Sequence, residues 1–357
     1  MRNIGTSGCG TTLFRNPPSP PLLEPAAEFC SKRLQFDRVL SKYQSVTRKT
    51  NRSVPISTAH TQLGQQVKKL RPGEPVVLER HGKPVAGLVT MQDLAALQRE
   101  QPSMTVLMAF NHAGGAAKTS SIRDIGYELS QLGYRVLLID IDPQANLTSW
   151  LGVHDADGSR SLQPVLEDYA PLPEPYHVHG LDLIPSHLSL ARTDARLPGF
   201  TNAEGRLRAA IEEIRAQGTY DFVLIDPPPS LGKLTANAAN AADWVIVPVP
   251  ARYKGLVALE GLREMLREYT RTNPRLRVAM YLVTQVENTA HSKDTQEVFQ
   301  QILGDDLAGP LTYRPAVYNR CQPEGEPIGV NAPTSDARRE IQQVVTTLLQ
   351  RIGQADA

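Results

Sequence analysis

The chain has 357 residues, 41% hydrophobic and 21% charged, as in an ordinary globular protein, and no apolar run approaches the ~18 residues of a membrane span. Lys and Arg number 38 and Asp and Glu number 37, so the formal net charge of +1 does not by itself indicate a nucleic-acid-binding protein. The three cysteines, Cys9, Cys30 and Cys321, are scattered, which excludes a Cys-x-x-Cys zinc site and a disulfide framework.

Residues 1–53 show no clear hydrophobic periodicity, and PPSPPLLEP at Pro17–Pro25 is typical of extended or disordered chain. A continuous apolar core followed by a small-residue cleavage site, as in a signal peptide, does not occur there. A basic cluster with Asp37 as its only acid follows: Lys32, Arg33, Arg38, Lys42, Arg48, Lys49 and Arg52. We expect a disordered basic, Pro-rich arm, either a solvated tail or a segment that contacts nucleic-acid phosphates.

Residues 54–103 are predicted to form a small α+β module. The order is a short strand at 54–57, a helix at 58–70, two apolar runs joined by a hairpin at His81–Lys83, and a closing helix at 91–100. The first helix is indicated by apolar residues at helical spacing, which are Leu63, Val67 and Leu70.

The centre of this module, GEPVVLERHGKPVAGLV, resembles the N-terminal domain of Phd/YefM-type antitoxins. Members of that family dimerise and bind operator DNA, so the resemblance implies a DNA-binding or dimerisation module. The likeness is weaker in the first helix, where Thr58, His60 and Thr61 replace the usual pattern, and the chain has no toxin-neutralising tail. An α+β cap without a ligand is the alternative.

From residue 104 to residue 357, short apolar strands alternate with helical stretches. The predicted strands are Val106–Phe110, Val136–Ile139, Leu181–Ile184, Phe222–Ile225, Trp244–Pro248 and Val278–Thr284. This alternation predicts an α/β fold with a mostly parallel sheet covered by helices on both faces. Trp150–Tyr176, rich in Asp and Pro, is predicted to be a long connection. Ser335–Ile352 is a final helix whose apolar spacing indicates a core face or, alternatively, an amphipathic membrane anchor.

The most informative segment is FNHAGGAAKT at Phe110–Thr119, where an apolar strand leads into a Gly-containing loop and then a helix. This is the order of a phosphate-binding P-loop, in which backbone N–H groups face a polyphosphate. Lys118 would add a cation near the β- and γ-phosphates, and Thr119 would offer its hydroxyl to Mg²⁺. The candidate nucleotide-binding residues are Gly114, Gly115, Ala116, Ala117, Lys118, Thr119 and Ser120.

The compact GGxxKT loop is followed by IDIDPQ, by YDFVLIDPPPSLG at Tyr220–Gly232 and by a third block at Leu234–Leu262. These motifs, in this order, resemble the deviant P-loop ATPases of the ParA/Soj family, and the likeness covers roughly residues 105–352. The resemblance implies a P-loop NTPase fold that binds ATP and Mg²⁺. It also implies that Asp142 positions the attacking water and that Asp226 acts on Mg²⁺ as a Walker B carboxylate.

Two residues depart from the family pattern. Ala113 occupies the place of the signature Lys, which in the family reaches the nucleotide of the dimer partner. Ala117 stands where Gly is usual, and its methyl group restricts the loop if the turn requires a positive φ. These departures affect the prediction of ATP hydrolysis more than that of nucleotide binding, and a degenerate P-loop without turnover is the alternative. Arg314 aligns with a family Arg near the nucleotide, but Tyr313 and Pro315 replace the residues that flank it.

The resemblance implies a cytoplasmic, nucleoid-associated ATPase in plasmid or chromosome partition. Its expected partners are a second copy of itself in an ATP-dependent homodimer, nonspecific DNA and a ParB-like centromere-binding protein, with no membrane. One alternative is a nucleotide-gated transcriptional autorepressor that reads an operator through the Phd-like module. The second is a membrane-associated positioning ATPase of the MinD kind.

Overall fold

The computed structural model describes residues 53–68, 76–80, 83–88 and 104–355, together with Leu70 and Thr90. The chain divides into two compact units, Met1–Glu100 and Gln101–Ala357, which we describe separately. Residues 1–52 of the predicted arm and the predicted closing helix at 91–100 lie outside the described residues.

The smaller unit contains a three-stranded sheet and one helix. Its strands are β1 (Ser53–Pro55), β2 (Val76–Arg80) and β3 (Lys83–Leu88), in the order β1-β2-β3. β2 and β3 pair antiparallel, so the predicted hairpin is present, and β1 pairs parallel with β2. Helix α2 (Ile56–Lys68) begins directly after β1, two residues earlier than predicted. Leu63 and Val67, four residues apart on α2, are 49% and 51% exposed.

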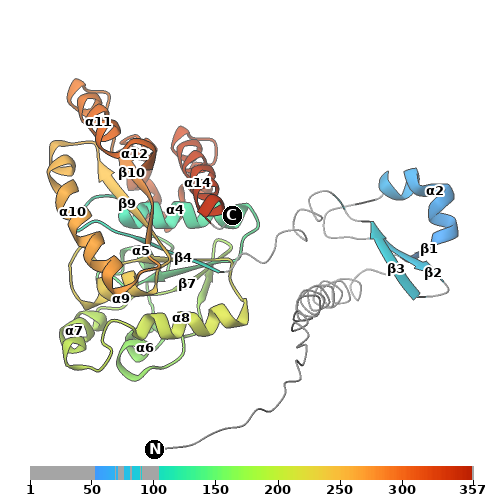
Figure 1. Ribbon diagram of the computed structural model, residues 1–357, viewed down its shortest axis with the longest axis horizontal. Helices are drawn as coiled ribbons and strands as arrows, with labels where there is room; N and C mark the ends of the chain where they lie inside the picture. Colours follow the sequence, from blue (N-terminus) through green and yellow to red (C-terminus); the bar gives the residue numbers. More distant parts are fainter. Residues whose placement is uncertain are drawn as a thin grey trace, which may run out of the picture. The chain divides into compact units, whose positions relative to one another are not determined.

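The larger unit is built on an eight-stranded sheet in the order β11-β10-β9-β4-β8-β5-β7-β6 (Figure 1). The strands are β4 (Thr105–Ala109), β5 (Val136–Asp140), β6 (Tyr176–Val178), β7 (Leu181–Ile184), β8 (Phe222–Asp226), β9 (Trp244–Pro250), β10 (Arg277–Thr284) and β11 (Leu307–Ala308). All neighbouring strands pair parallel except β6 and β7. The predicted fold class, a mostly parallel sheet between helical layers, is confirmed.

The central strands are mostly apolar because both faces of the sheet are covered, and β5 and β8 each end in an aspartate. β4 is buried along its whole length, and its side chains alternate between two cores. Val106 and Met108 belong to one hydrophobic cluster, whereas Leu107 and Ala109 belong to the other. A continuous apolar run is therefore the expected sequence of such a strand.

One face of the sheet packs against α4 (Lys118–Gln131) and α14 (Asp336–Ala355). The opposite face packs against α8 (Arg206–Gln217), α9 (Lys233–Ala241), α10 (Tyr253–Thr272) and α11 (Ala290–Leu303) (Figure 1). The shorter helices are α5 (Asn146–Ser149), α6 (Gln163–Asp168), α7 (Ser189–Arg196), α12 (Pro315–Glu324) and α13 (Ile328–Asn331), with 3-10 turns at Gly158–Arg160, Leu197–Gly199 and Gly304–Asp306.

Helix α14 connects distant parts of the larger unit. Arg338 forms an ion pair of 2.7 Å with Glu128 on α4, and Glu340 forms one of 2.6 Å with Arg314. Arg351 donates hydrogen bonds to four backbone carbonyls, which belong to Ala279, Asp305, Asp306 and Leu307. The apolar face of α14 is buried in the core through Ile341, Val344, Val345, Leu348 and Ile352. The prediction of a core face is thus confirmed, and this face is not free to insert into a lipid surface.

The prediction of one long connection at Trp150–Tyr176 is wrong in part. The segment contains helix α6, and its Pro164 lies in the first turn. The N–H that proline lacks has no partner within the helix there, and the fixed φ of proline suits a helix. The short strands β6 and β11 were not predicted, because two or three residues carry too little periodicity. Among the described residues, no helix is both long and apolar enough to cross a membrane.

Candidate functional site

The loop between β4 and α4 has the conformation of a tight phosphate-binding turn. Gly115 has φ of 73° and Ala117 has φ of 71°, so the backbone enters the left-handed region twice before α4 begins at Lys118. Glycine enters this region freely, whereas alanine there is disfavoured by about 1 kcal/mol or more. The turn therefore requires a positive φ at position 117, and Ala117 adopts it although the methyl group makes this conformation unfavourable.

The N–H groups of this loop are free to receive a ligand. Within the described part of the chain, the N–H groups of Gly115, Ala116 and Ala117 donate no hydrogen bond, and no side chain caps α4. The first N–H groups of a helix have no partner inside the helix either, and the helix dipole favours negative charge at this end. The loop and the start of α4 together form a set of donors suited to an anion.

Lys118 is buried beneath this loop. Its Nζ donates a hydrogen bond of 2.9 Å to the carbonyl of Asn111, and the side chain of Asn111 donates one of 2.7 Å to the carbonyl of Pro248 on β9. Burial lowers the pKa of Lys118 below its usual value, and the negative charges of Asp226 and Asp142 oppose this shift. The two carboxylates therefore help to keep a cation in a largely dry position.

Three carboxyl groups gather at the carboxyl ends of β5 and β8. Asp140 ends β5 and Asp142 follows it, whereas Asp226 ends β8 and pairs in register with Asp140. Asp140 accepts hydrogen bonds of 2.9 and 2.7 Å from the N–H and hydroxyl of Thr148. Asp142 accepts one of 2.9 Å from the N–H of Gln144. This edge of an open α/β sheet is where ligands usually bind.

Asp226 differs from the other two carboxyl groups in lacking partners. Neither of its buried oxygens makes a hydrogen bond of good geometry with the residues that the structure describes. Burial raises the pKa of Asp226 to about 7, with the nearby hydroxyl of Thr119 and the charge of Lys118 acting against the shift. Burial also raises the pKa of Asp140 well above its usual value. A buried carboxyl without partners is a strained arrangement that a bound cation would relieve.

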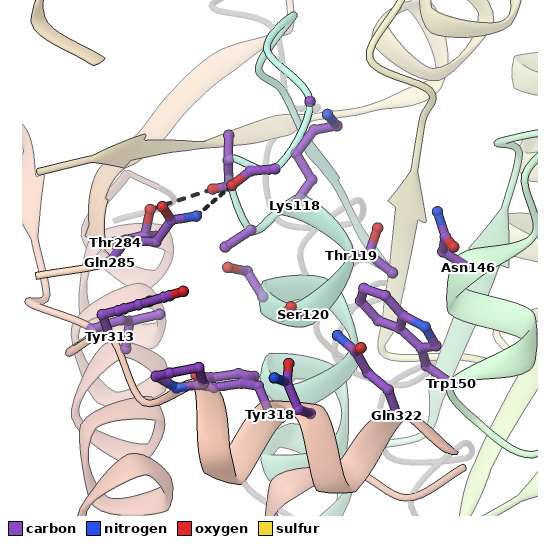
Figure 2. A pocket seen from close by; sticks show the side chains of 18 of the residues that line it. Lys118, Thr119, Ser120, Asn146, Trp150, Thr284, Gln285, Tyr313, Tyr318 and Gln322 are labelled. Carbon is purple, nitrogen blue, oxygen red and sulfur yellow. Dashed lines mark hydrogen bonds between the residues drawn. The ribbon is translucent and has the colours of Figure 1, made fainter. Parts of the chain in front are cut away.

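The far wall of the site is formed by β10 and α12. Thr284 donates a hydrogen bond of 3.3 Å to the carbonyl of Ala116, and Gln285 donates one to the carbonyl of Gly115. Tyr313 and Tyr318 lie along the wall opposite the loop, and Trp150 lies at the other end of the cavity near Gln322 (Figure 2). The cavity has a volume of about 380 Å³, which is in the range of small-molecule sites.

The structure brings most of the predicted residues to this one cavity. Its lining includes Asp142 and the whole predicted loop, Gly114, Gly115, Ala116, Ala117, Lys118, Thr119 and Ser120. Asp226 does not line the cavity and lies beneath it, close to Lys118 and Thr119. Arg314 lines the cavity, with its charge matched by Glu340.

Sequence reasoning missed several residues of the site. Asp140 stands in the same IDIDPQ segment as Asp142, and its place at the end of a strand was the available signal. Asn111, Gln285 and Tyr318 gave no local signal, because their contacts join segments that are far apart in the sequence.

Comparison with known proteins agrees with this geometry. A family model described as an AAA domain matches residues 104–280 and does not reach residues 54–100. The probable plasmid-partitioning protein ParA of Thermus thermophilus is 40% identical over 261 residues, which cover 70% of this chain and 79% of that protein. The sporulation initiation inhibitor protein Soj of Bacillus subtilis is 40% identical over 164 residues, 45% of this chain and 63% of that protein.

Solved structures show the same fold. Cobyrinic acid a,c-diamide synthase from Mycobacterium smegmatis, with bound ADP and magnesium, has a TM-score of 0.59 and 28% identity over 71% of this chain and 96% of its own. A putative plasmid partition protein from Borrelia burgdorferi bound to AMPPNP has a TM-score of 0.57 and 21% identity, over 70% of this chain and 99% of its own. The second likeness concerns the fold alone.

Proposed function

The chain belongs to the ParA family of partition ATPases, and from this premise we propose that it binds ATP with Mg²⁺ at Gly114–Ser120 and hydrolyses it. The observation that carries the proposal is the buried carboxyl of Asp226, which lacks hydrogen-bond partners yet lies beside Lys118 and Thr119. Such a carboxyl is typical of a place where a bound divalent cation completes the local charge balance.

The residues present suit a nucleotide with a hard divalent cation. N–H groups of the loop would bind the phosphate oxygens, and Lys118 would add positive charge beside them. Thr119 would offer a hydroxyl oxygen, and Asp226 would act on the metal through water, since Mg²⁺ takes oxygen ligands and keeps several waters. When bound, the metal neutralises the phosphate charge. ADP and magnesium in the Mycobacterium smegmatis structure support this assignment.

Hydrolysis would depend on Asp142. Its carboxyl lines the cavity and is fixed at one oxygen by the N–H of Gln144, which suits it to orient a water for attack on the γ-phosphate. Ala113 leaves the place of the family's signature Lys without a charge. We infer that turnover is slow, or that another cation of the assembled dimer supplies this charge.

Partition would follow from a nucleotide-dependent cycle. Two subunits would sandwich ATP, and the dimer would bind nonspecific DNA through basic side chains until a ParB-like partner stimulated hydrolysis. The name of the Thermus relative, a probable plasmid-partitioning protein, supports partition as the process. DNA affinity would be strongly salt-dependent, because phosphate contacts release counterions. The family's site of action implies a cytoplasmic, nucleoid-associated protein.

We propose a second candidate function from the resemblance of residues 54–103 to the Phd/YefM-type antitoxins. In the described part of this range, a helix precedes a hairpin, which is the order expected of such a dimerisation or DNA-binding module. Leu63 and Val67 present an apolar strip on α2 that association with a second surface would bury. In this reading the protein is an autorepressor whose operator binding is gated by nucleotide. Footprinting separates the two, since a discrete protected site favours repression and uniform coating favours partition.

The decisive test is ATP hydrolysis by the full chain, with and without DNA and its ParB-like partner. Wild type is compared with Lys118→Ala, which should lose ATP binding, and with Lys293→Ala, which removes an exposed lysine on α11 and should leave ATP binding unchanged. Ala113→Lys should raise turnover. Absence of ATP binding by the wild type would contradict the proposal, whereas binding without turnover would favour the nucleotide-gated repressor.

A further inference from the structure

The phosphate loop is tied to the carboxyl end of β10 by two adjacent side chains. Thr284 donates to the carbonyl of Ala116, and the amide of Gln285 donates to the carbonyl of Gly115 (Figure 2). Thr284 is the last residue of β10 and Gln285 follows it, and they are separated from their partners in the loop by 168 and 170 positions in the sequence. They thus form a tertiary contact that fixes two consecutive peptide groups.

This contact involves a disfavoured backbone conformation at Gln285, and another at the residue that follows its two partners in the loop. Ala117 has φ of 71° and Gln285 has φ of 53°, and neither residue is a glycine. Non-glycine residues in this region persist where their surroundings hold them, and such outliers gather at functional sites. The loop would relax from its turn more readily if the bonds from β10 were removed.

The two bonds also set the direction of the loop's N–H groups. In a trans peptide the carbonyl of one residue and the N–H of the next point in opposite directions. Fixing the carbonyls of Gly115 and Ala116 toward β10 therefore turns the N–H groups of Ala116 and Ala117 away from it. Both N–H groups lack a partner within the described residues, so they are available to a ligand.

We propose that Gln285 is a positioning residue for phosphate binding, acting through the loop and not on the nucleotide itself. It keeps the peptides of Gly115 and Ala116 oriented for a polyphosphate and holds the turn that Ala117 disfavours. Thr284 supports it through the second carbonyl. This inference rests on the proposed function, in which ATP occupies the loop.

The test is a double-mutant cycle on the full chain, with ATP affinity measured by calorimetry in the presence of Mg²⁺. Gln285→Leu should weaken ATP binding about fivefold, the effect of one neutral hydrogen bond. In an Ala117→Gly background the same change should weaken it about twofold or less, because glycine adopts the turn unaided. Gln300→Leu is the matched control. Gln300 on α11 also donates its side-chain amide to a glycine carbonyl, that of Gly304, but it does not line the nucleotide cavity.

The outcomes separate the possibilities. Equal ATP affinity of wild type and Gln285→Leu would overturn the positioning role, and so would an equal loss in both backgrounds, which indicates a purely structural effect. Failure of the wild type to bind ATP would instead overturn the proposed function, and this inference with it. If Gln285→Leu does not fold, Gln285→Glu retains the volume but replaces the donor with an acceptor. It should weaken binding more than fivefold, and wild-type affinity in that variant would overturn the inference.

Discussion

Asp140 and Asp226 stand opposite each other as register partners on the adjacent parallel strands β5 and β8, and both are buried. Asp140 is satisfied by Thr148, whereas neither oxygen of Asp226 has a hydrogen bond of good geometry among the described residues, although the hydroxyl of Thr119 lies nearby. Burial raises the pKa of both carboxyls, and the charge of Asp226 raises that of Asp140 further. The sheet thus places repelling carboxyls beneath the phosphate loop, and Lys118 is the nearby cation.

Asp226→Asn should stabilise the ligand-free protein at alkaline pH. The folded-state pKa of Asp226 is about 7, above its ordinary 3.8, so the folded protein binds more protons than the unfolded chain between these values. Stability should therefore fall as pH rises from about 4 to 7, and the penalty should be complete above 7. We expect the variant to gain up to about 4 kcal/mol at pH 8, the equivalent of a pKa raised from 3.8 to about 7, and nothing near pH 4, by thermal or urea unfolding. A pH-independent difference would contradict this account.

Affinity for ATP in the presence of Mg²⁺ should depend on pH through Asp226. The metal favours the carboxylate form, so below a pKa of about 7 a proton must leave before the site is complete. The ratio of wild-type to Asp226→Asn affinity should rise about tenfold between pH 6 and pH 8. Taking this ratio cancels the titration of ATP itself. A constant ratio across the range, measured by calorimetry, would argue against a role for Asp226 near the metal.

Asp142→Ala should separate binding from turnover. If Asp142 orients the attacking water, its loss should lower partner-stimulated ATP hydrolysis by about 100-fold or more while changing ATP affinity little. Asp155→Ala removes an exposed carboxyl beyond α5 and serves as the control. The readout is phosphate release under saturating ATP, with affinity measured separately. Intact turnover in Asp142→Ala would show that the assigned role is wrong.

Two glycines of α10 should respond in opposite directions to alanine. A Cβ at Gly255 would lie 2.2 Å from the backbone carbonyl of Pro250, so Gly255→Ala should destabilise the fold by about 1–3 kcal/mol. A Cβ at Gly261 would meet nothing within 4 Å, and Gly261→Ala should stabilise the helix by about 0.5–1 kcal/mol. Urea unfolding of both variants measures this, and equal effects would contradict the close approach of β9 and α10.

Much of the fold could be predicted because parallel strands buried on both faces leave continuous apolar runs. Val136–Asp140 and Phe222–Asp226 are such strands, and each was predicted to within one residue. The short strand at Leu307–Ala308 exists because it pairs with β10. This pairing could not be predicted from the residues around position 307. Pro164 suggested a loop but lies in the first turn of α6.

The candidate site divides in the same way. Lys118 and Thr119 lie within one short motif, and their proximity follows from chain connectivity. The supports of that motif come from elsewhere, with Asn111 held by Pro248 and Gly115 held by Gln285. The order of the strands in the sheet brings these distant segments together, so such contacts cannot be predicted from a single sequence. The sequence predicted strain at Ala117 only if the turn required a positive φ, and Ala117 does have a positive φ in the structure.

The way in which α14 connects the larger unit has a consequence for biosynthesis. Its Arg338 binds Glu128 on α4, its Glu340 binds Arg314 at the cavity wall, and its Arg351 binds carbonyls around β10 and β11. A nascent chain on the ribosome has none of these contacts until residues 336–355 have emerged. Because domains fold as units during translation, the nucleotide cavity would close only after this helix is released. Until then, the apolar surface beneath it would be available to chaperones.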